Sequence, residues 1–153
     1  MTVSHPTKYL SEWFIRYSKN RDLAFRKIAS IREEENKVFV EQKDGKVIEY
    51  AIEPFPADVY TITQSISSQN KGLVVYNTQE NLDVLLKSWK NLISMNDLTI
   101  YFVNPFSKTD KRWIINPRTH SLISDSASLK QGLMSMYMTV DPTTKEEIEK
   151  LTK

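Results

Sequence analysis

The chain has 153 residues, of which 40% are hydrophobic and 26% are charged, and its formal net charge is +2. These values are typical of one folded globular domain and exclude a disordered or fibrous chain. Cysteine is absent, which excludes disulfides, thiolate metal sites and cysteine nucleophiles.

The first third of the chain predicts a helix followed by a small antiparallel sheet. Apolar residues recur at three- and four-residue spacing from Tyr9 to Tyr17, which predicts a helix with an aromatic face. The stretch 26–33 fits a helix by the spacing of its isoleucines, but we favour a strand. A β-hairpin is predicted over 38–52, because Asp44 and Gly45 suit a tight turn between β-branched and aromatic residues.

The middle of the chain predicts alternating strands and helices. Pro54 and Pro56 end the hairpin, and the alternation over 58–66 predicts a further strand. A polar loop over 65–71 then leads to an apolar strand at 73–76, of the kind that is covered on both faces.

The next prediction is a helix capped by Thr78. Its apolar stripe is Leu82, Leu85, Leu86, Trp89, Leu92 and Ile93. Strands follow at 98–103 and 112–115, and the strand, helix, strand succession predicts a parallel pairing with a right-handed crossover. A helix at 128–138 and a last helix capped by Thr143 or Thr144 complete the chain.

These elements predict one α/β domain over residues 1–153, with a central mixed β-sheet and helices on both faces. An N-terminal helix and hairpin occupy 7–53, the core occupies about 55–117, and C-terminal helices occupy 127–152. No apolar run reaches the roughly 20 residues that a membrane-spanning helix needs, and the start of the chain lacks the apolar segment of a signal peptide. We therefore expect a cytoplasmic protein with no membrane partner.

The order of elements over the core, with Pro56-Ala57-Asp58 at the head of a predicted strand, resembles the PD-(D/E)XK nuclease-like fold, which includes the archaeal Holliday-junction resolvases. The resemblance implies a restriction-endonuclease-like core of α-βββ(β)-α-ββ-α order, in which two carboxylates hold Mg²⁺ or Mn²⁺ and a lysine orients the attacking water. Asp58 takes the first position of the motif. The next strand, 73–77, has neither the glutamate nor the lysine of the family.

The resemblance permits an active site that has migrated onto the following helix. Asp58 and Glu80 would then be the metal ligands, Lys87 would be the third catalytic residue, and Asn77 or Gln79 would be neutral ligands. The alternative is structural: Asp58 is a turn residue after a proline, and Glu80 is a carboxylate stabilised by the helix dipole.

Other kinds of catalytic site have little support in the sequence. His120 and Asp125 form a possible acid/base or metal pair, against the simpler interpretation of His120 as a loop residue. The chain has only three glycines and no Gly-x-Ser-x-Gly, which argues against a serine-hydrolase elbow, a P-loop and a Rossmann dinucleotide site. We therefore expect no nucleotide cofactor, and a metal only if the protein is a nuclease.

Basic and aromatic residues provide a second functional hypothesis. The N-terminal fifth has an excess of cations, which forms either a solvated face or a phosphate-binding surface. The residues that would contact DNA or RNA are Arg16, Lys19, Arg21, Arg112 and Arg118. Trp13, Trp89 and Trp113 are possible base-stacking residues, although Trp89 also fits the core.

Three functions remain open at this stage. The preferred one is a non-catalytic nucleic-acid-binding or assembly protein that has kept a nuclease-like scaffold. The alternatives are a divalent-metal-dependent endonuclease with migrated residues, and a protein-interaction module that binds no nucleic acid. The methionine-rich segment at 134–138 either fills gaps in the core or forms a homodimer interface.

Overall fold

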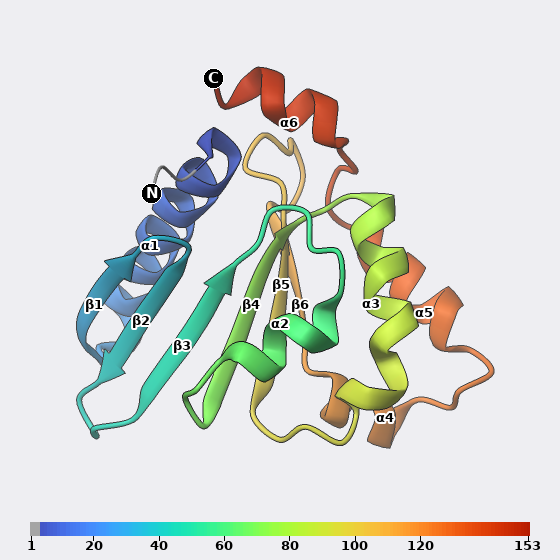
Figure 1. Ribbon diagram of the computed structural model, residues 1–153, viewed down its shortest axis with the longest axis horizontal. Coiled ribbons are helices and arrows are strands. Elements are labelled where there is room, and N and C mark those ends of the chain that lie inside the picture. Colours follow the sequence, from blue (N-terminus) through green and yellow to red (C-terminus); the bar gives the residue numbers. More distant parts are fainter. Residues whose placement is uncertain (1–3) are drawn as a thin grey trace.

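The computed structural model describes residues 4–153, and its centre is one six-stranded sheet whose strands lie side by side in chain order (Figure 1). The strands are β1 (Ile28–Glu34), β2 (Lys37–Gln42), β3 (Val47–Ile52), β4 (Asn70–Tyr76), β5 (Leu98–Val103) and β6 (Arg112–Ile115). β4 lies parallel to β3 and to β5, whereas the other neighbouring pairs are antiparallel. The predicted mixed sheet is therefore confirmed.

The helices that the structure describes are α1 (His5–Phe25), α2 (Val59–Ser65), α3 (Gln79–Leu92), α4 (Pro117–Ile123), α5 (Leu129–Tyr137) and α6 (Lys145–Leu151). α1 begins where the Ser4 hydroxyl accepts a hydrogen bond from the Thr7 backbone N–H, and it ends at Arg26, whose φ is 51°. It is thus longer than the predicted aromatic segment. Among residues 4–153, no helix combines the length and apolar character that crossing a lipid bilayer requires.

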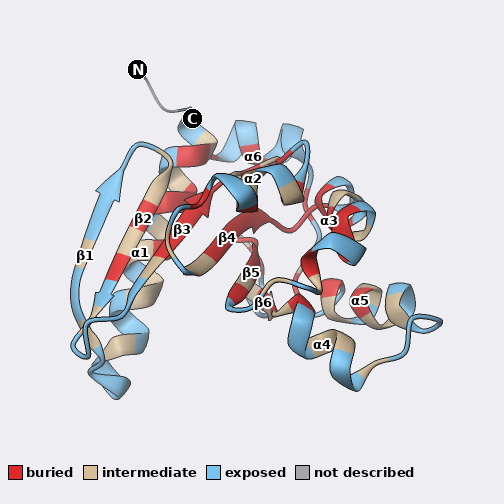
Figure 2. Cartoon of the chain, turned by 60° about the horizontal axis from the view of Figure 1, so that its bottom comes forward, coloured by how far each residue is buried: buried red, intermediate tan, exposed pale blue. Residues whose placement is uncertain are grey.

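Helices cover both faces of the sheet, as predicted. Leu10 and Phe14 of α1 and Ile148 of α6 pack on one face. α2, α3 and α5 pack on the other face, where α2 and α3 lie in front of the sheet in Figure 1. β4, at the centre, is buried along most of its length, whereas the edge strand β1 is mainly exposed (Figure 2).

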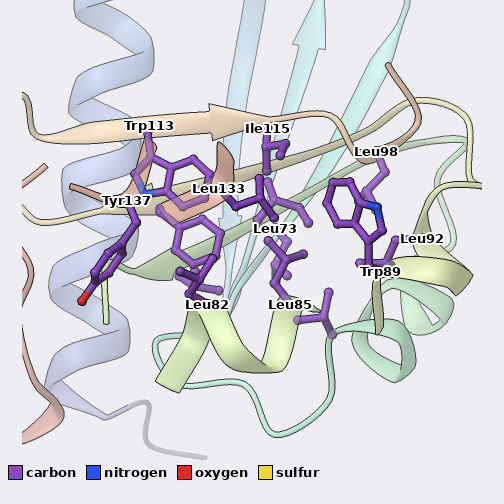
Figure 3. Packing of buried hydrophobic residues seen from close by; sticks show 14 of the residues in the cluster. Leu73, Leu82, Leu85, Trp89, Leu92, Leu98, Trp113, Ile115, Leu133 and Tyr137 are labelled. Atoms are coloured by element: carbon purple, nitrogen blue, oxygen red, sulfur yellow. The ribbon is translucent and has the colours of Figure 1, made fainter. Parts of the chain in front are cut away.

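The β4–α3–β5 unit agrees with its prediction. The Thr78 hydroxyl accepts from the Asn81 backbone N–H and begins α3. β4 and β5 pair in parallel, as the strand, helix, strand order requires. Along the predicted stripe Leu82, Leu85, Trp89 and Leu92 are buried, and Figure 3 shows them packed against residues of the sheet and of α5.

The predicted hairpin at 38–52 is also confirmed, as β2 and β3, and its turn contains Gly45 with a φ of 91°. The preference for a strand near residue 30 is confirmed by β1. The helix predicted at 128–138 is α5, and Thr144, rather than Thr143, caps α6 through a bond from the Glu147 backbone N–H.

Three predictions of local structure are wrong. Residues 58–66 form no strand, because Val59 and Thr63, four positions apart, are buried on one face of helix α2, and Asp58 caps its first turn. The segment around His120, interpreted as a loop, is helix α4, which begins at Pro117. β4 also begins within the predicted loop, at residue 70. Asp58 therefore lies at the start of a helix and not at the head of a strand.

Candidate nucleic-acid interface

Three aromatic residues follow one another along a flank of α1, four residues apart. We call Tyr9, Trp13 and Tyr17 the aromatic row; each is half-buried. Four-residue spacing places side chains one above another on a helix, and the rings of Trp13 and Tyr17 are stacked with centroids 5.2 Å apart and an interplanar angle of 8°. Tyr9 stacks on Phe106, from the loop before β6, at 5.2 Å. The row is thus rigid, with part of each residue open to solvent.

An arginine from the far part of the chain completes this flank. The Nε of Arg112, the first residue of β6, donates to the Tyr17 hydroxyl at 2.8 Å. Its guanidinium carbon also lies 5.4 Å from the centroid of the Tyr17 ring, within the range of a cation–π contact. The edge strand β6 therefore adds a positive charge to a surface built mainly by α1.

Two arginines of α1 lie on the same flank. Arg16 and Arg21, with Trp13, Tyr17 and Asn20, line an open depression of about 410 Å³. Three of the five predicted phosphate-contacting residues are thus gathered around one stacked pair of aromatic rings. We call Trp13, Arg16, Tyr17, Arg21 and Arg112 the α1 patch.

The other two predicted cations lie elsewhere. Lys19 lines a separate depression toward β1, together with Glu12, Glu33 and Arg16. Arg118 is exposed on α4, which lies at the opposite end of the molecule from α1 in both Figure 1 and Figure 2. Neither residue lines the depression of the α1 patch.

The three tryptophans differ in burial. Trp89 and Trp113 are only 7% and 4% exposed, and both pack within the core in Figure 3. Trp113 stacks on Phe102 with centroids 4.3 Å apart, and its indole N–H donates to Asn77 at 2.7 Å. Of the three tryptophans, only Trp13 is half-buried rather than buried, so it is the one that a ligand can reach.

Asp58 is the N-cap residue of α2. Its carboxylate accepts hydrogen bonds from the backbone N–H groups of Tyr60 and Thr61, from the Thr61 hydroxyl, and from the Ser88 hydroxyl at 3.4 Å. These bonds, led by the one from the Thr61 backbone, hold the pKa of this exposed carboxyl below its usual value. Lys87 lines the same shallow depression as Asp58 and Ser88.

Glu80 lies at the other end of α3 from this depression. It occupies the first turn of the helix, and Ser88 follows eight residues later, about 12 Å along the axis. The pKa of the Tyr137 hydroxyl is raised, first by burial and then by the negative charges of Glu80 and Asp83. The structure therefore brings Asp58 and Lys87 together and leaves Glu80 apart.

The remaining residues proposed as ligands have partners of their own. The side chain of Asn77 is buried and donates to the carbonyls of Tyr137 and Val140, and Gln79 donates to Asp83. In the part of the chain that the structure describes, no three histidine, aspartate or glutamate side chains are grouped so that they could hold a metal ion.

His120 and Asp125 also contact different neighbours. The His120 ring meets Trp89 edge-on, with centroids 5.8 Å apart. Asp125 accepts from the backbone N–H and the hydroxyl of Ser128, and these bonds, the hydroxyl's first, lower the pKa of its carboxyl. The acid/base pair suggested by their spacing has no contact to support it.

The methionine-rich segment fills gaps in the core in part. Met134 and Met136 are half-buried and pack against the core, whereas Met138 is 61% exposed. A homodimer interface at this segment stays a prediction.

Sequence reasoning missed Tyr17 as a functional residue, although its four-residue spacing from Trp13 was a usable signal. Its contact with Arg112 had no local signal, because the two residues are 95 positions apart. Comparisons of the chain with protein-family models, with curated protein sequences and with solved structures give no match.

Proposed function

We propose that this protein binds single-stranded nucleic acid along the flank of α1, without cleaving it. The observation that carries the proposal is the bond from Arg112 to Tyr17, because it brings a third guanidinium to a stacked pair of half-exposed aromatic rings. Aromatic platforms beside cations are the usual means of holding unpaired bases and their phosphates, and stacking tolerates any base.

The stacked pair in the aromatic row supports a single strand over a duplex. The Trp13 and Tyr17 rings already stack on each other with centroids 5.2 Å apart, so a base can stack only on an outer face of the pair. The faces of a paired base are covered by its neighbours in the duplex, whereas a base of an unpaired strand can turn a face toward a protein ring.

The charge of α1 agrees with this ligand. The helix carries four cations, Lys8, Arg16, Lys19 and Arg21, against the two carboxylates Glu12 and Asp22. Asp22 is partly satisfied, because its carboxylate accepts from the backbone N–H groups at positions 27 and 28. Arg16 and Arg21, which line the depression with Trp13 and Tyr17, place positive charge beside the aromatic row, where phosphates of a bound strand would pass.

The test is binding of a fluorescein-labelled strand of about 12 thymidines, measured by anisotropy at low salt, where phosphate affinity is greatest. Trp13→Ala should weaken binding by roughly 5- to 150-fold, as expected for one lost stacking contact of ~1–3 kcal/mol. Trp13 fluorescence should also be quenched by the strand, while the buried tryptophans stay unchanged.

The matched control is Arg118→Gln, which removes the same charge from α4, away from the α1 patch. It should bind the strand like the unmodified protein, whereas Arg16→Gln should not. Absence of binding at low salt would overturn the proposal and leave the protein-interaction role. Equal losses in the two arginine variants would show that the charge acts without a defined site.

A further inference from the structure

A second feature of the same region is a cavity of about 270 Å³ between the C-terminal half of α1 and the sheet. Its walls combine aromatic, apolar and polar side chains from α1, β1, β2, β3 and β5. They include Tyr17, Arg21, Gln42, Ile48, Tyr50 and Tyr101. Tyr17 and Arg21 belong to the α1 patch as well, so the cavity opens beside the aromatic row.

The cavity exists because α1 presents a small side chain to the sheet at this level. One turn earlier Phe14 fills the same face of the helix, with its ring centroid 4.6 Å from that of Tyr50 and 5.2 Å from that of Tyr101. Four residues later stands Ser18, which lines the cavity and is too small to occupy it. The space is thus a consequence of one residue in the helix.

The floor of the cavity depends on a glycine in β4. Gly72 is the parallel-strand partner of Tyr50, and a Cβ at Gly72 would lie 2.1 Å from Cδ1 of Tyr50. The Tyr50 ring therefore lies flat against β4. Burial, and then the neighbouring Tyr101, raises the pKa of Tyr50, so its hydroxyl remains a hydrogen-bond donor.

The volume of the cavity and the chemistry of its lining residues favour a small aromatic ligand with a phosphate. Small-molecule sites commonly span about 300–1,000 Å³, so this cavity admits little more than one flat ring system. Tyrosine rings provide faces for stacking, and the Gln42 amide carries the donor and acceptor pair that hydrogen-bonds the edge of a base. Arg21 and Lys27 lie at the same cavity, as does Asp22, whose carboxylate accepts hydrogen bonds from the backbone N–H groups at positions 27 and 28. The two cations supply positive charge for the attached phosphate.

We propose that this cavity receives one unstacked nucleobase of the strand held on the α1 patch. The inference rests on the proposed function and adds a specific subsite to it. An unpaired base can swing out of the strand and be read on its hydrogen-bonding edge, which paired bases cannot do without cost. The cavity would therefore strengthen the preference for unpaired nucleotides.

The test fills the cavity without changing a residue of the aromatic row. Ser18→Phe should weaken binding of the thymidine strand by roughly tenfold, the loss of about one base contact, and should keep or raise the melting temperature. Ser135→Phe, which adds the same side chain to the exposed face of α5, should change neither. Thymidine monophosphate should shift the NMR amide signals of Gln42 and Ile48 in the unmodified protein and not in Ser18→Phe.

The outcomes separate this inference from the proposed function. If Ser18→Phe folds and binds the strand with unchanged affinity, the cavity is not a base site, while the α1 patch still stands. If the unmodified protein binds no strand, both proposals are overturned. If Ser18→Phe fails to fold, Gln42→Leu takes its place, and its affinity for the strand should fall about 2- to 10-fold because one hydrogen bond is missing. Unchanged affinity in that variant would overturn the proposal that the cavity binds a base.

Discussion

The salt dependence of binding is the most quantitative consequence of the α1 patch. Each phosphate that a cation neutralises contributes about −0.7 to the slope of log K against log salt for a single strand. The patch offers three guanidinium groups, from Arg16, Arg21 and Arg112, so the expected slope is about −2.1. Between 50 and 200 mM salt the affinity should then fall about 18-fold.

Arg16→Gln removes one exposed guanidinium and should reduce the slope to about −1.4, which corresponds to about a 7-fold fall over the same salt range. The assay is anisotropy of the labelled thymidine strand at four or more salt concentrations, with melting temperatures to check folding. A slope that Arg16→Gln leaves unchanged would refute the reasoning. So would an equal reduction by Arg118→Gln, since Arg118 lies on α4.

Three further predictions concern stability, each measured by urea denaturation. Gly72→Ala should lower the free energy of unfolding by ~1–3 kcal/mol, because the new Cβ meets the Tyr50 ring; unchanged stability would contradict that contact. Leu85→Ala, at a fully buried position, should cost ~2–5 kcal/mol, and the half-buried neighbour Leu86→Ala should cost clearly less. Burial raises the pKa of Glu53 above its ordinary 4.5, against the opposing hydrogen bond from Asn36. The unmodified protein should therefore lose stability as pH rises from the unfolded pKa of about 4.5 through the raised folded pKa. Glu53→Gln should lack that loss, and identical pH profiles would contradict it.

The predictions from sequence succeeded where a local pattern and tertiary packing agree. The stripe that ends at Leu92 is buried as expected, because helical spacing and the parallel pairing of β4 and β5 place the same residues in the core. They failed at residues 58–66, where alternation of apolar and polar residues competed with a helical spacing of similar strength. The helix is the stable form of this segment, because Asp58 caps its first turn and because Val59 and Thr63 are buried in it.

The candidate site shows the same division. Arg16, Arg21, Arg112 and Trp13 were identified from residue type alone, but so were Lys19 and Arg118, which lie away from the α1 patch. Asp58 and Glu80 were joined by a family resemblance, and about 12 Å of helix α3 separates Glu80 from the Ser88 that bonds Asp58. The residue type indicates what a side chain can bind. Only its position in the tertiary structure decides which other side chains share its site.

The sequence by itself determined the α/β class, the mixed sheet and the cationic and aromatic character of α1, because these follow from periodicity, turn residues and charge along a short stretch of chain. Only the tertiary structure decided that Arg112 lies on Tyr17, that Trp113 is buried, and that Ser18 leaves a cavity against Tyr50 and Tyr101. The first and the third depend on how α1 packs across strands that are distant in sequence. The second depends on how β6 pairs with β5 and brings Trp113 against Phe102 and Asn77, and no local pattern encodes such contacts.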